Sequence, residues 1–232
     1  MDQPLELQEP CPLKNQGCPV VDELRRLKEE VKRLQELSQT DTLTGLFNFR
    51  YLLTALEGEM ERTRRTGLST ALIMIDLDNF KQVNDTYGHE SGNKALQWSS
   101  RIWRDNIRRI DIPCRYGGEE FAIILPGARL PQAVRTAERL RALLVNSPVN
   151  LNSELPRLTA SFGVDVYTVR ESLSVEAFIK RTDHFLLEAK AKGRNCVCYK
   201  EIKRTVARTE ITDKEREALF ITRRSARQAR QS

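Results

Sequence analysis

Two strongly apolar segments of the sequence lie next to acidic residues, and this pairing constrains the fold more than any other feature. The first segment, residues 71–75, leads directly into Asp76 and Asp78. The second, residues 121–125, follows the run Gly117-Gly118-Glu119-Glu120. A short, continuous apolar run is consistent with a strand buried on both faces, and paired glycines favour a hairpin turn. We therefore expect two neighbouring strands that bring carboxylates together at one edge of a sheet.

Composition narrows the classes to which the chain can belong. Of its 232 residues, 40% are hydrophobic and 30% are charged, which is enough for a real core and excludes wholesale disorder. No unbroken apolar run is longer than residues 71–75, far below the roughly 18 residues that a bilayer span requires. The first residues also lack the charged and apolar regions of a signal peptide. Five cysteines without a dense framework indicate a reduced, cytoplasmic compartment.

Strand and helix signals alternate through the body of the chain, residues 41–200, which predicts one α/β domain with a mixed sheet flanked by helices. We expect strands over 71–77, 114–116, 121–125 and 158–166, and helices over 91–109, 130–146 and 176–192. The first of these helices should stop before Pro113, because the residue preceding a proline is driven out of the helical region. Gly193 suits the C-terminal cap of the last helix.

The segment before this body predicts a dimer. Residues 20–40 form a predicted coiled-coil dimerisation helix, because apolar residues follow a heptad spacing among dense charges, namely Val20, Leu24, Leu27, Val31 and Leu34. An amphipathic surface helix would show a similar stripe, but this stripe is narrow, as in a parallel two-stranded coiled coil. Residues 1–19 are irregular. Cys11 and Cys18 in this stretch are either unpaired or, pooled across a dimer, four zinc ligands.

The chain carries a net charge of +6, and much of the excess lies in its last residues. Residues 201–232 therefore predict a basic, flexible tail. Nucleic-acid binding is the alternative interpretation of this tail, but no stacking aromatic residues are interleaved with its basic side chains, which argues against it.

Several motifs follow one another in a recognisable order. Gly117-Gly118-Glu119-Glu120-Phe121 comes after Asp41-Thr-Leu-Thr-Gly-Leu-Phe-Asn48 and residues 76–85, Asp-Leu-Asp-Asn-Phe-Lys-Gln-Val-Asn-Asp. Gly88-His89, residues 161–164 and the closing 189–195, Ala-Lys-Ala-Lys-Gly-Arg-Asn, complete the set, which spans about 160 residues. This pattern resembles the GGDEF family of diguanylate cyclases, in its GGEEF form.

The resemblance implies a fold like the palm of nucleotide cyclases and polymerases, with the signature on a hairpin. It also implies a reaction, the condensation of two GTP to cyclic di-GMP with loss of two pyrophosphates. Each subunit of a homodimer would hold one GTP. The coiled coil would then keep two half-sites close together and raise their effective concentration.

The same resemblance assigns roles to the acidic residues. Asp76 and Glu119, with the backbone carbonyl of Leu77, would hold two Mg²⁺ ions per active site, for which Mn²⁺ can substitute. Glu119 or Glu120 would assist deprotonation of the 3′-hydroxyl, and the choice between them stays open. Lys81 would stabilise charge at the phosphates. For the glutamates alone, a solvated turn is the alternative interpretation.

Further motif residues would contact the substrate. Lys190 and Arg194 lie four apart, so we expect both to point from one helix face toward the triphosphate; a basic helix end that answers the macrodipole is the alternative. Asn84 resembles the guanine contact of the family, and His89 a residue on the substrate side. Gly118 would let a phosphate approach the backbone.

Asn93 departs from the family pattern, which usually has aspartate here. A carboxylate only accepts hydrogen bonds and so selects guanine, whereas an amide both donates and accepts. We expect the enzyme to prefer GTP still. The alternative is a hybrid cyclase that also takes ATP and forms cyclic GMP–AMP. Phe49, where arginine is common, lies at an outer position with no expected role in the chemistry.

Arg108 and Asp111 match the R-x-x-D inhibitory site of the family, at the expected distance before Gly117. We expect the two side chains to share one helix face and bind the cyclic di-GMP product, with Arg139 as a second contact; a surface ion pair is the alternative. Arg115 is assigned to the phosphate or product surface. A catalytically silent cyclic di-GMP receptor is disfavoured, because all the signature carboxylates and lysines are present. The upstream sensory partner is not identified.

Overall fold

The computed structural model describes residues 19–37, 39–151 and 157–200, and these residues build a five-stranded mixed sheet in the order β2-β3-β1-β4-β5. The strands are β1 (Thr70–Leu77), β2 (Ile112–Gly117), β3 (Glu120–Pro126), β4 (Ala160–Tyr167) and β5 (Val197–Tyr199). β1 lies at the centre and is antiparallel to both β3 and β4, whereas β5 is parallel to β4. The α/β fold class expected from the sequence is confirmed.

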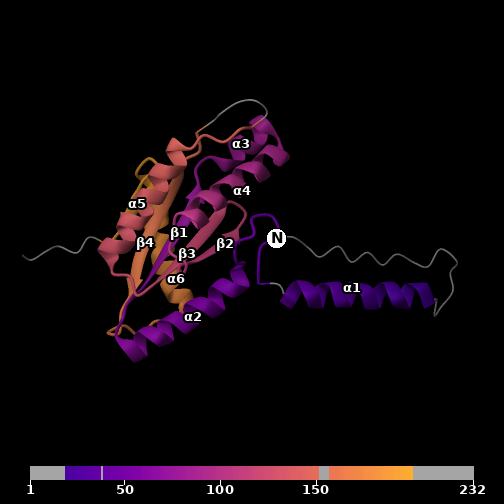
Figure 1. Ribbon diagram of the computed structural model, residues 1–232, viewed down its shortest axis with the longest axis horizontal. Helices are drawn as coiled ribbons and strands as arrows, with labels where there is room; N and C mark the ends of the chain where they lie inside the picture. The colour runs from indigo at the N-terminus through magenta and orange to yellow at the C-terminus, as the bar shows by residue number, and fades with distance from the viewer. Residues whose placement is uncertain (1–18, 38, 152–156, 201–232) are drawn as a thin grey trace, which may run out of the picture. The chain divides into compact units, whose positions relative to one another are not determined.

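Six helices are formed by the described residues: α1 (Pro19–Leu37), α2 (Phe49–Thr66), α3 (Phe80–Tyr87), α4 (His89–Asp105), α5 (Leu130–Asn146) and α6 (Val175–Ala191). α4 and α5 cover one face of the sheet, and α2 and α6 cover the other (Figure 1). α3 follows β1 directly and packs on α4.

Alternate residues of β1 enter two separate apolar cores. Ala71, Ile73 and Ile75 pack on the side of α4 and α5. Leu72 and Met74 pack on the side of α2 and α6. Because successive side chains of a strand point to opposite faces, both faces must be buried, which explains the unbroken apolar run. Each large side chain buried in this way stabilises the fold by about 1.5–3 kcal/mol relative to exposure.

α6 approaches β4 closely because Gly163 has no side chain. An ideal Cβ at this position would lie 2.3 Å from the backbone nitrogen of Leu186 and 2.6 Å from the carbonyl oxygen of Thr182. Real Cβ atoms do not come so near to backbone, so only glycine fits here. This contact sets how α6 lies on the sheet, and Lys190 follows Leu186 by one helical turn.

The structure corrects two predicted helix ends. The helix predicted over 91–109 begins at His89 and ends at Asp105, where the N–H of Asn106 donates to the carbonyl of Trp103. Ile110, which continues the apolar spacing of this segment beyond the helix end, is 60% exposed. The helix predicted over 176–192 ends at Ala191. α2, α3 and β5 had no counterpart in the prediction.

α1 exposes the apolar stripe that the heptad spacing predicts. Leu24 is 48% exposed, Leu27 55%, Val31 52% and Leu34 56%. The pairing of this helix into a coiled coil and the proposed domain limits stay predictions. The predictions of an irregular segment over 1–19, of a role for Cys11 and Cys18, and of a basic tail over 201–232 concern residues that lie almost entirely outside the described ranges. Within the described segments, no helix combines the length and apolar character that spanning a bilayer requires.

Candidate active site

Three carboxylates gather where β1 and β3 lie side by side. Asp76 stands opposite Glu120 in the β1–β3 ladder, and the N–H of Leu77 donates to the carbonyl of Glu119 at 3.3 Å. The turn between β2 and β3 requires a left-handed residue, and Gly118 supplies it with φ of 47°. The hairpin thus places both signature glutamates beside the end of β1.

Lys190, in the last turn of α6, contacts this carboxylate cluster directly. Its Nζ lies 2.7 Å from Oδ2 of Asp76, and the two side chains are 31% and 11% exposed. Burial raises the pKa of Asp76 above its ordinary value; the charge of Glu119 adds to this increase, while the Lys190 ammonium opposes it. The lysine is therefore the counter-charge of a carboxylate that would otherwise lie buried beside like charges.

Glu120 shares the same environment. Burial raises its pKa, and the nearby charges of Asp76, Asp183 and Glu119 raise it further, against the opposing charge of Lys190. Carboxylates brought this close cannot all ionise freely without a compensating cation. Carboxylates whose pKa values are shifted by burial and by neighbouring charges are common at functional sites.

Both carboxylate oxygens of Asp78 accept hydrogen bonds, unlike the cluster that its position two residues after Asp76 predicts. One oxygen accepts from the hydroxyl of Ser161 at 2.6 Å. The other accepts from the hydroxyl of Thr159 at 2.7 Å and from the N–H of Asn195 at 3.0 Å. These donors satisfy the buried carboxylate. Asp78 therefore ties the loop after α6 to β4 instead of offering a free cation ligand.

The loop after α6 adopts a run of left-handed conformations. Gly193, Arg194 and Asn195 have φ of 106°, 66° and 45°. For residues other than glycine this conformation costs roughly 1–2 kcal/mol each. Arg141 of α5 opposes that cost by donating from Nη1 to the carbonyl oxygen of Asn195 at 3.3 Å and to its Oδ1 at 3.1 Å. No sequence pattern singled out Arg141, since its partner lies far along the chain.

This loop also corrects the predicted relation between the two basic residues. Lys190 and Arg194 do not share a helix face, because α6 ends at Ala191 and the backbone then turns left-handed. Lys190 is directed to Asp76, whereas Arg194 is exposed. The two residues still lie at the same end of the sheet, because Asp78 binds the loop that carries Arg194.

The remaining residues predicted to contact the substrate lie on α3 and α4. Lys81 and Asn84 belong to α3, and His89 and Asn93 to the first turns of α4; all but the half-buried Asn84 are exposed. Asn84 lies against Gly92, where an ideal Cβ would stand only 1.8 Å from its Oδ1. Gly92 therefore makes the room in which the Asn84 carboxamide lies between the two helices.

Arg115 joins the signature turn to the beginning of the domain. Its Nε and Nη2 donate to the carbonyl of Gly118 at 3.0 and 2.7 Å. Its Nη1 donates to the carboxylate of Asp41 at 3.1 and 3.2 Å, and Asp41 also accepts from the N–H and hydroxyl of Thr44. Instead of facing a phosphate or product surface, the guanidinium fixes the turn that carries the glutamates.

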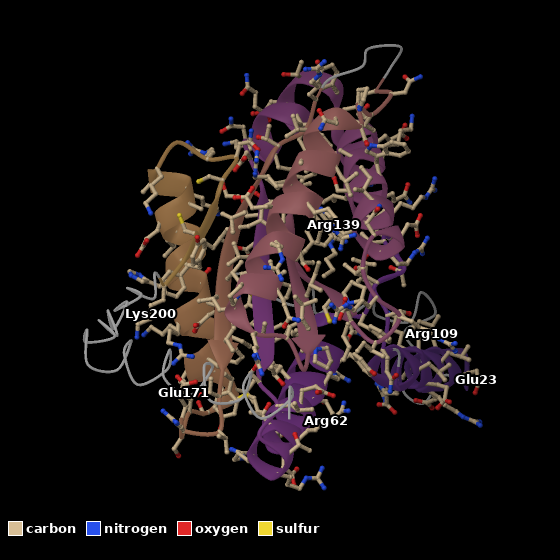
Figure 2. All side chains as sticks on the ribbon, turned by 60° about the vertical axis from the view of Figure 1, so that its left-hand side comes forward. Glu23, Arg62, Arg109, Arg139, Glu171 and Lys200 are labelled. Atoms are coloured by element: carbon tan, nitrogen blue, oxygen red, sulfur yellow. The ribbon has the colours of Figure 1, made fainter. Side chains whose placement is uncertain are left out.

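The R-x-x-D residues lie in a turn, and the prediction of a shared helix face is wrong because α4 has already ended. Asp111 accepts from the N–H of Arg108 at 2.8 Å, and its own N–H donates to the carbonyl of Arg108 at 3.0 Å. Burial raises the pKa of Asp111, and the charges of Arg108 and Arg139 oppose this. Arg139 of α5, labelled in Figure 2, is therefore close enough to act on this turn electrostatically.

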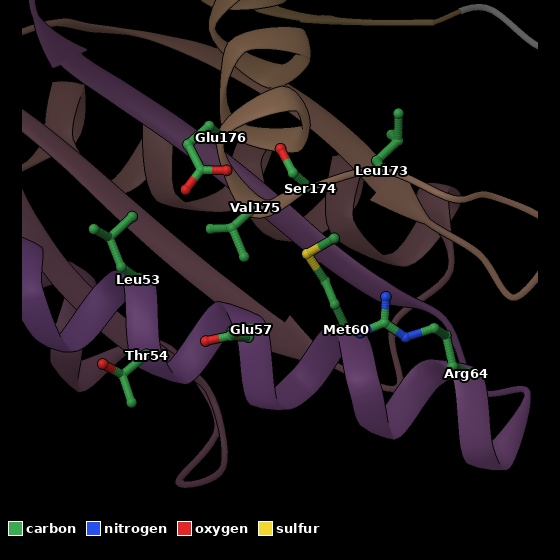
Figure 3. A pocket seen from close by; sticks show the side chains of 9 residues that line it. All are labelled: Leu53, Thr54, Glu57, Met60, Arg64, Leu173, Ser174, Val175 and Glu176. Carbon is green, nitrogen blue, oxygen red and sulfur yellow. The ribbon is translucent and has the colours of Figure 1, made fainter.

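A separate groove of about 290 Å³ lies between α2 and the start of α6 (Figure 3). Its lining includes Leu53, Met60 and Val175. α6 begins just after β4, whose last residue, Tyr167, stands opposite the first residue of β1. The groove therefore belongs to the end of the sheet away from Asp76, and none of the predicted site residues lines it.

The donors at the carboxylate cluster fit a hard cation that is only partly held by protein. Among the described residues, no three His, Cys, Asp or Glu side chains are arranged to enclose a metal ion. Asp76, Glu119 and the carbonyl of Leu77 offer oxygen ligands alone. Mg²⁺ commonly binds through one or two carboxylates together with substrate phosphates, so this donor set suits it.

Comparisons with known proteins agree with the motifs. Residues 38–196 match the family model described as diguanylate cyclase, GGDEF domain. The chain is 40% identical over 173 residues to the response regulator PleD of Caulobacter vibrioides, which covers 74% of this chain and 38% of that protein. It is 37% identical over 186 residues to the diguanylate cyclase DosC of Escherichia coli, with 80% and 40% covered. The chain thus spans about two fifths of the length of these curated relatives.

Solved structures share the fold. The diguanylate cyclase SiaD of Pseudomonas aeruginosa, solved with its activator SiaC, has a TM-score of 0.67 and 38% identity, covering 78% of this chain and 69% of that one. The coiled coil and GGDEF domain of DgcB from Caulobacter crescentus, solved with c-di-GMP, also has a TM-score of 0.67, with 26% identity and 78% and 95% covered.

Proposed function

Since the chain belongs to the GGDEF-domain family, we propose that it is a cytoplasmic diguanylate cyclase, which condenses two GTP to cyclic di-GMP and two pyrophosphates. The observation that carries this proposal is the cluster of Asp76, Glu119 and Glu120 with Lys190 beside it. A protein that only bound cyclic di-GMP would have no need of this cluster.

Asp76, Glu119 and the carbonyl of Leu77 would hold Mg²⁺, or Mn²⁺ in its place. When bound, the metal neutralises phosphate charge and makes the 3′-hydroxyl of GTP more acidic. Glu119 or Glu120 would take the proton of that hydroxyl. The 3′-oxygen then bonds to the α-phosphorus of the second GTP while the bond to pyrophosphate breaks, and the reciprocal step closes the ring.

Basic and polar side chains would position the nucleotide. Lys81, Lys190 and Arg194 provide positive charge for the triphosphate, where fixed charge stabilises the transition state. The exposed turn at Gly118 leaves room for phosphate near the backbone. Asn84 would contact guanine from its place against Gly92, with His89 on the substrate side.

Each domain would supply half of the reaction, because each binds one GTP and the two nucleotides must face each other. The exposed stripe of α1 would join two copies in a homodimer and so raise the effective concentration of one half-site at the other. Sedimentation of the intact chain should show a dimer that Leu27→Asp weakens, together with a loss of activity at low protein concentration.

Product inhibition would act at the turn of Arg108 and Asp111, with Arg139 as a second contact. The two arginines lie near one buried carboxylate, and an arginine and a carboxylate together can recognise a guanine edge. Arg108→Ala should leave the initial rate unchanged and prevent the slowing of the reaction as cyclic di-GMP accumulates. Equal slowing in both proteins would refute this part of the proposal.

A second candidate function is a hybrid cyclase, favoured by the amide at Asn93 where the family usually has a carboxylate. The exposed position of Asn93 on α4 lets the side chain contact a base without disturbing the core. Asn93→Asp should remove mixed products if the amide is their cause, because a carboxylate can only accept hydrogen bonds.

A product assay tests both functions. The purified chain is supplied with Mg²⁺ and with GTP, ATP or an equal mixture, and the products are identified by chromatography and mass. Dominance of cyclic di-GMP in the mixture supports the first function, and abundant cyclic GMP–AMP supports the second. No product from the wild-type dimer, under conditions in which a known diguanylate cyclase is active, would refute both. Glu119→Gln is the matched inactive control.

A further inference from the structure

We propose that Lys190 acts as a built-in competitor for the metal at Asp76, so that the nucleotide-free site excludes a divalent cation and accepts it together with the triphosphate. The inference rests on the proposed function, in which Asp76 is a metal ligand. It concerns the order of binding, which that function leaves open.

The geometry places one cation where another would bind. The Lys190 ammonium lies 2.7 Å from Oδ2 of Asp76, whose residue is only 8% exposed. A bound Mg²⁺ would stand about 2.0–2.1 Å from its oxygen ligand. Two cations at such distances from one carboxylate repel each other in a poorly solvated site, so each disfavours the binding of the other.

The helix turn that carries Lys190 is held against the sheet. Ala189 is fully buried, and α6 lies against β4 through Gly163, so the last turn of the helix cannot draw back from the sheet. The carboxylate in turn needs the lysine, because Glu119 and Asp78 place further negative charge near Asp76. A hydrated ion that binds Asp76 must therefore displace an ammonium that already neutralises this carboxylate.

The triphosphate changes this balance. Lysine is a compact charge on a flexible stem and can turn from one anion to another without movement of its helix. Phosphate oxygens would give Lys190 new partners and supply the remaining ligands of the metal, while Asp76 becomes free. Metal and nucleotide would therefore bind cooperatively, each increasing the affinity of the other by the same factor.

Lys192 provides a matched control. It lies two residues away, is 65% exposed, and its ammonium is 3.7 Å from Glu188, on the surface of the same helix end. Replacing it changes the net charge by the same amount as replacing Lys190. A general electrostatic effect should appear in both variants, whereas competition at Asp76 should appear in one.

The experiment is a titration of the intact, nucleotide-free protein with Mn²⁺, in which electron paramagnetic resonance measures the free ion. We expect Lys190→Met to bind Mn²⁺ about tenfold or more tightly than the wild type, and Lys192→Met to bind like the wild type. After subtraction of the Mn²⁺ that the free analogue binds in a protein-free titration, adding a non-reacting GTP analogue should tighten Mn²⁺ binding to the wild type strongly and to Lys190→Met less. Lys190→Gln serves as the second variant, and thermal unfolding verifies that each protein is folded.

The outcomes separate the two proposals. Equal Mn²⁺ affinity of wild type and both Lys190 variants without nucleotide, with the wild type still binding Mn²⁺ when the analogue is added, would overturn the competition alone. Failure of every protein to bind Mn²⁺ even with the analogue would overturn the metal site and hence the proposed function. If Lys190→Met binds tightly and Asp76→Asn in that background abolishes the binding, the competition is at Asp76, as proposed.

Discussion

Replacing Gly92 by alanine should impair nucleotide binding without impairing the fold. The new Cβ would stand 1.8 Å from Oδ1 of Asn84, 3.0 Å from its Cγ and 3.3 Å from Cζ of Phe80. The atom in closest conflict is the end of a flexible side chain, so the Asn84 carboxamide must rotate away. An off-rotamer side chain costs about 0.5–1.5 kcal/mol, while removing glycine from a helix interior stabilises by roughly 0.5–1 kcal/mol. These effects nearly cancel.

The loss of nucleotide binding in Gly92→Ala has no compensating gain. If Asn84 contacts the base, its displacement loses a hydrogen bond with a net value of about 0.5–1.5 kcal/mol, which corresponds to a KM for GTP raised about 2- to 13-fold. Pyrophosphate release measures KM, and thermal unfolding measures stability. Gly58→Ala in α2 is the matched control, because its Cβ would meet no atom within 4 Å; it should stabilise the protein and leave KM unchanged.

A double substitution tests whether Gly92→Ala raises KM through Asn84. Asn84→Ala should raise KM by a similar factor, and adding Gly92→Ala to it should raise KM no further, because both changes remove the same contact. An unchanged KM in Gly92→Ala, or fully additive effects in the double variant, would show that Gly92 does not act through Asn84.

Three further predictions follow from the geometry. Gly163→Ala should destabilise the fold by about 3 kcal/mol, the upper end of the range for overpacking, because its Cβ would meet backbone atoms of Leu186 that cannot rotate away; a urea midpoint within error of wild type would contradict this. Arg141→Ala should raise KM for GTP and change the free energy of unfolding little, since it releases the loop at Asn195. In steady-state kinetics, Arg141→Lys should restore part of the affinity for GTP. Glu120→Gln should stabilise the metal-free protein at neutral pH and lose this advantage on acidification. The pKa of Glu120 in the folded protein is raised above its ordinary value of 4.5. The ionised glutamate therefore destabilises the folded state, and this cost develops as pH rises from the ordinary pKa through the folded one. Urea unfolding across pH measures this, and a pH-independent difference from wild type would contradict it.

The sequence predicts the fold best where local pattern and burial agree. The apolar run of β1 is unbroken because both of its faces are covered, and the helix predicted over 130–146 has the observed limits of α5. The end of α4 was misplaced because Ile107 and Ile110 continue the apolar spacing, although the chain turns at Asn106 and leaves Ile110 exposed. Short elements such as β5, with three residues, give too little pattern to detect.

The sequence predicts some residues of the candidate site and misses others. The motifs locate Asp76, Glu119 and Glu120, because each stands at the end of a readable strand. They do not separate Asp76 from Asp78, which differ only in the partners that β4 and the loop after α6 provide. Contacts between residues far apart in the chain, such as Arg141 with Asn195, have no periodic signature and are visible only in the folded protein.

The position of a bound metal ion would show whether Asp76 and Glu119 form the catalytic site. Crystals grown with Mn²⁺ and a non-reacting GTP analogue would show the ion by anomalous scattering at the manganese edge. We expect Mn²⁺ bound to the carboxylates of Asp76 and Glu119 and the carbonyl of Leu77, with Lys190 on the phosphates. A nucleotide-bound Mn²⁺ that touches none of these oxygens, with Lys190 still on Asp76, would contradict it.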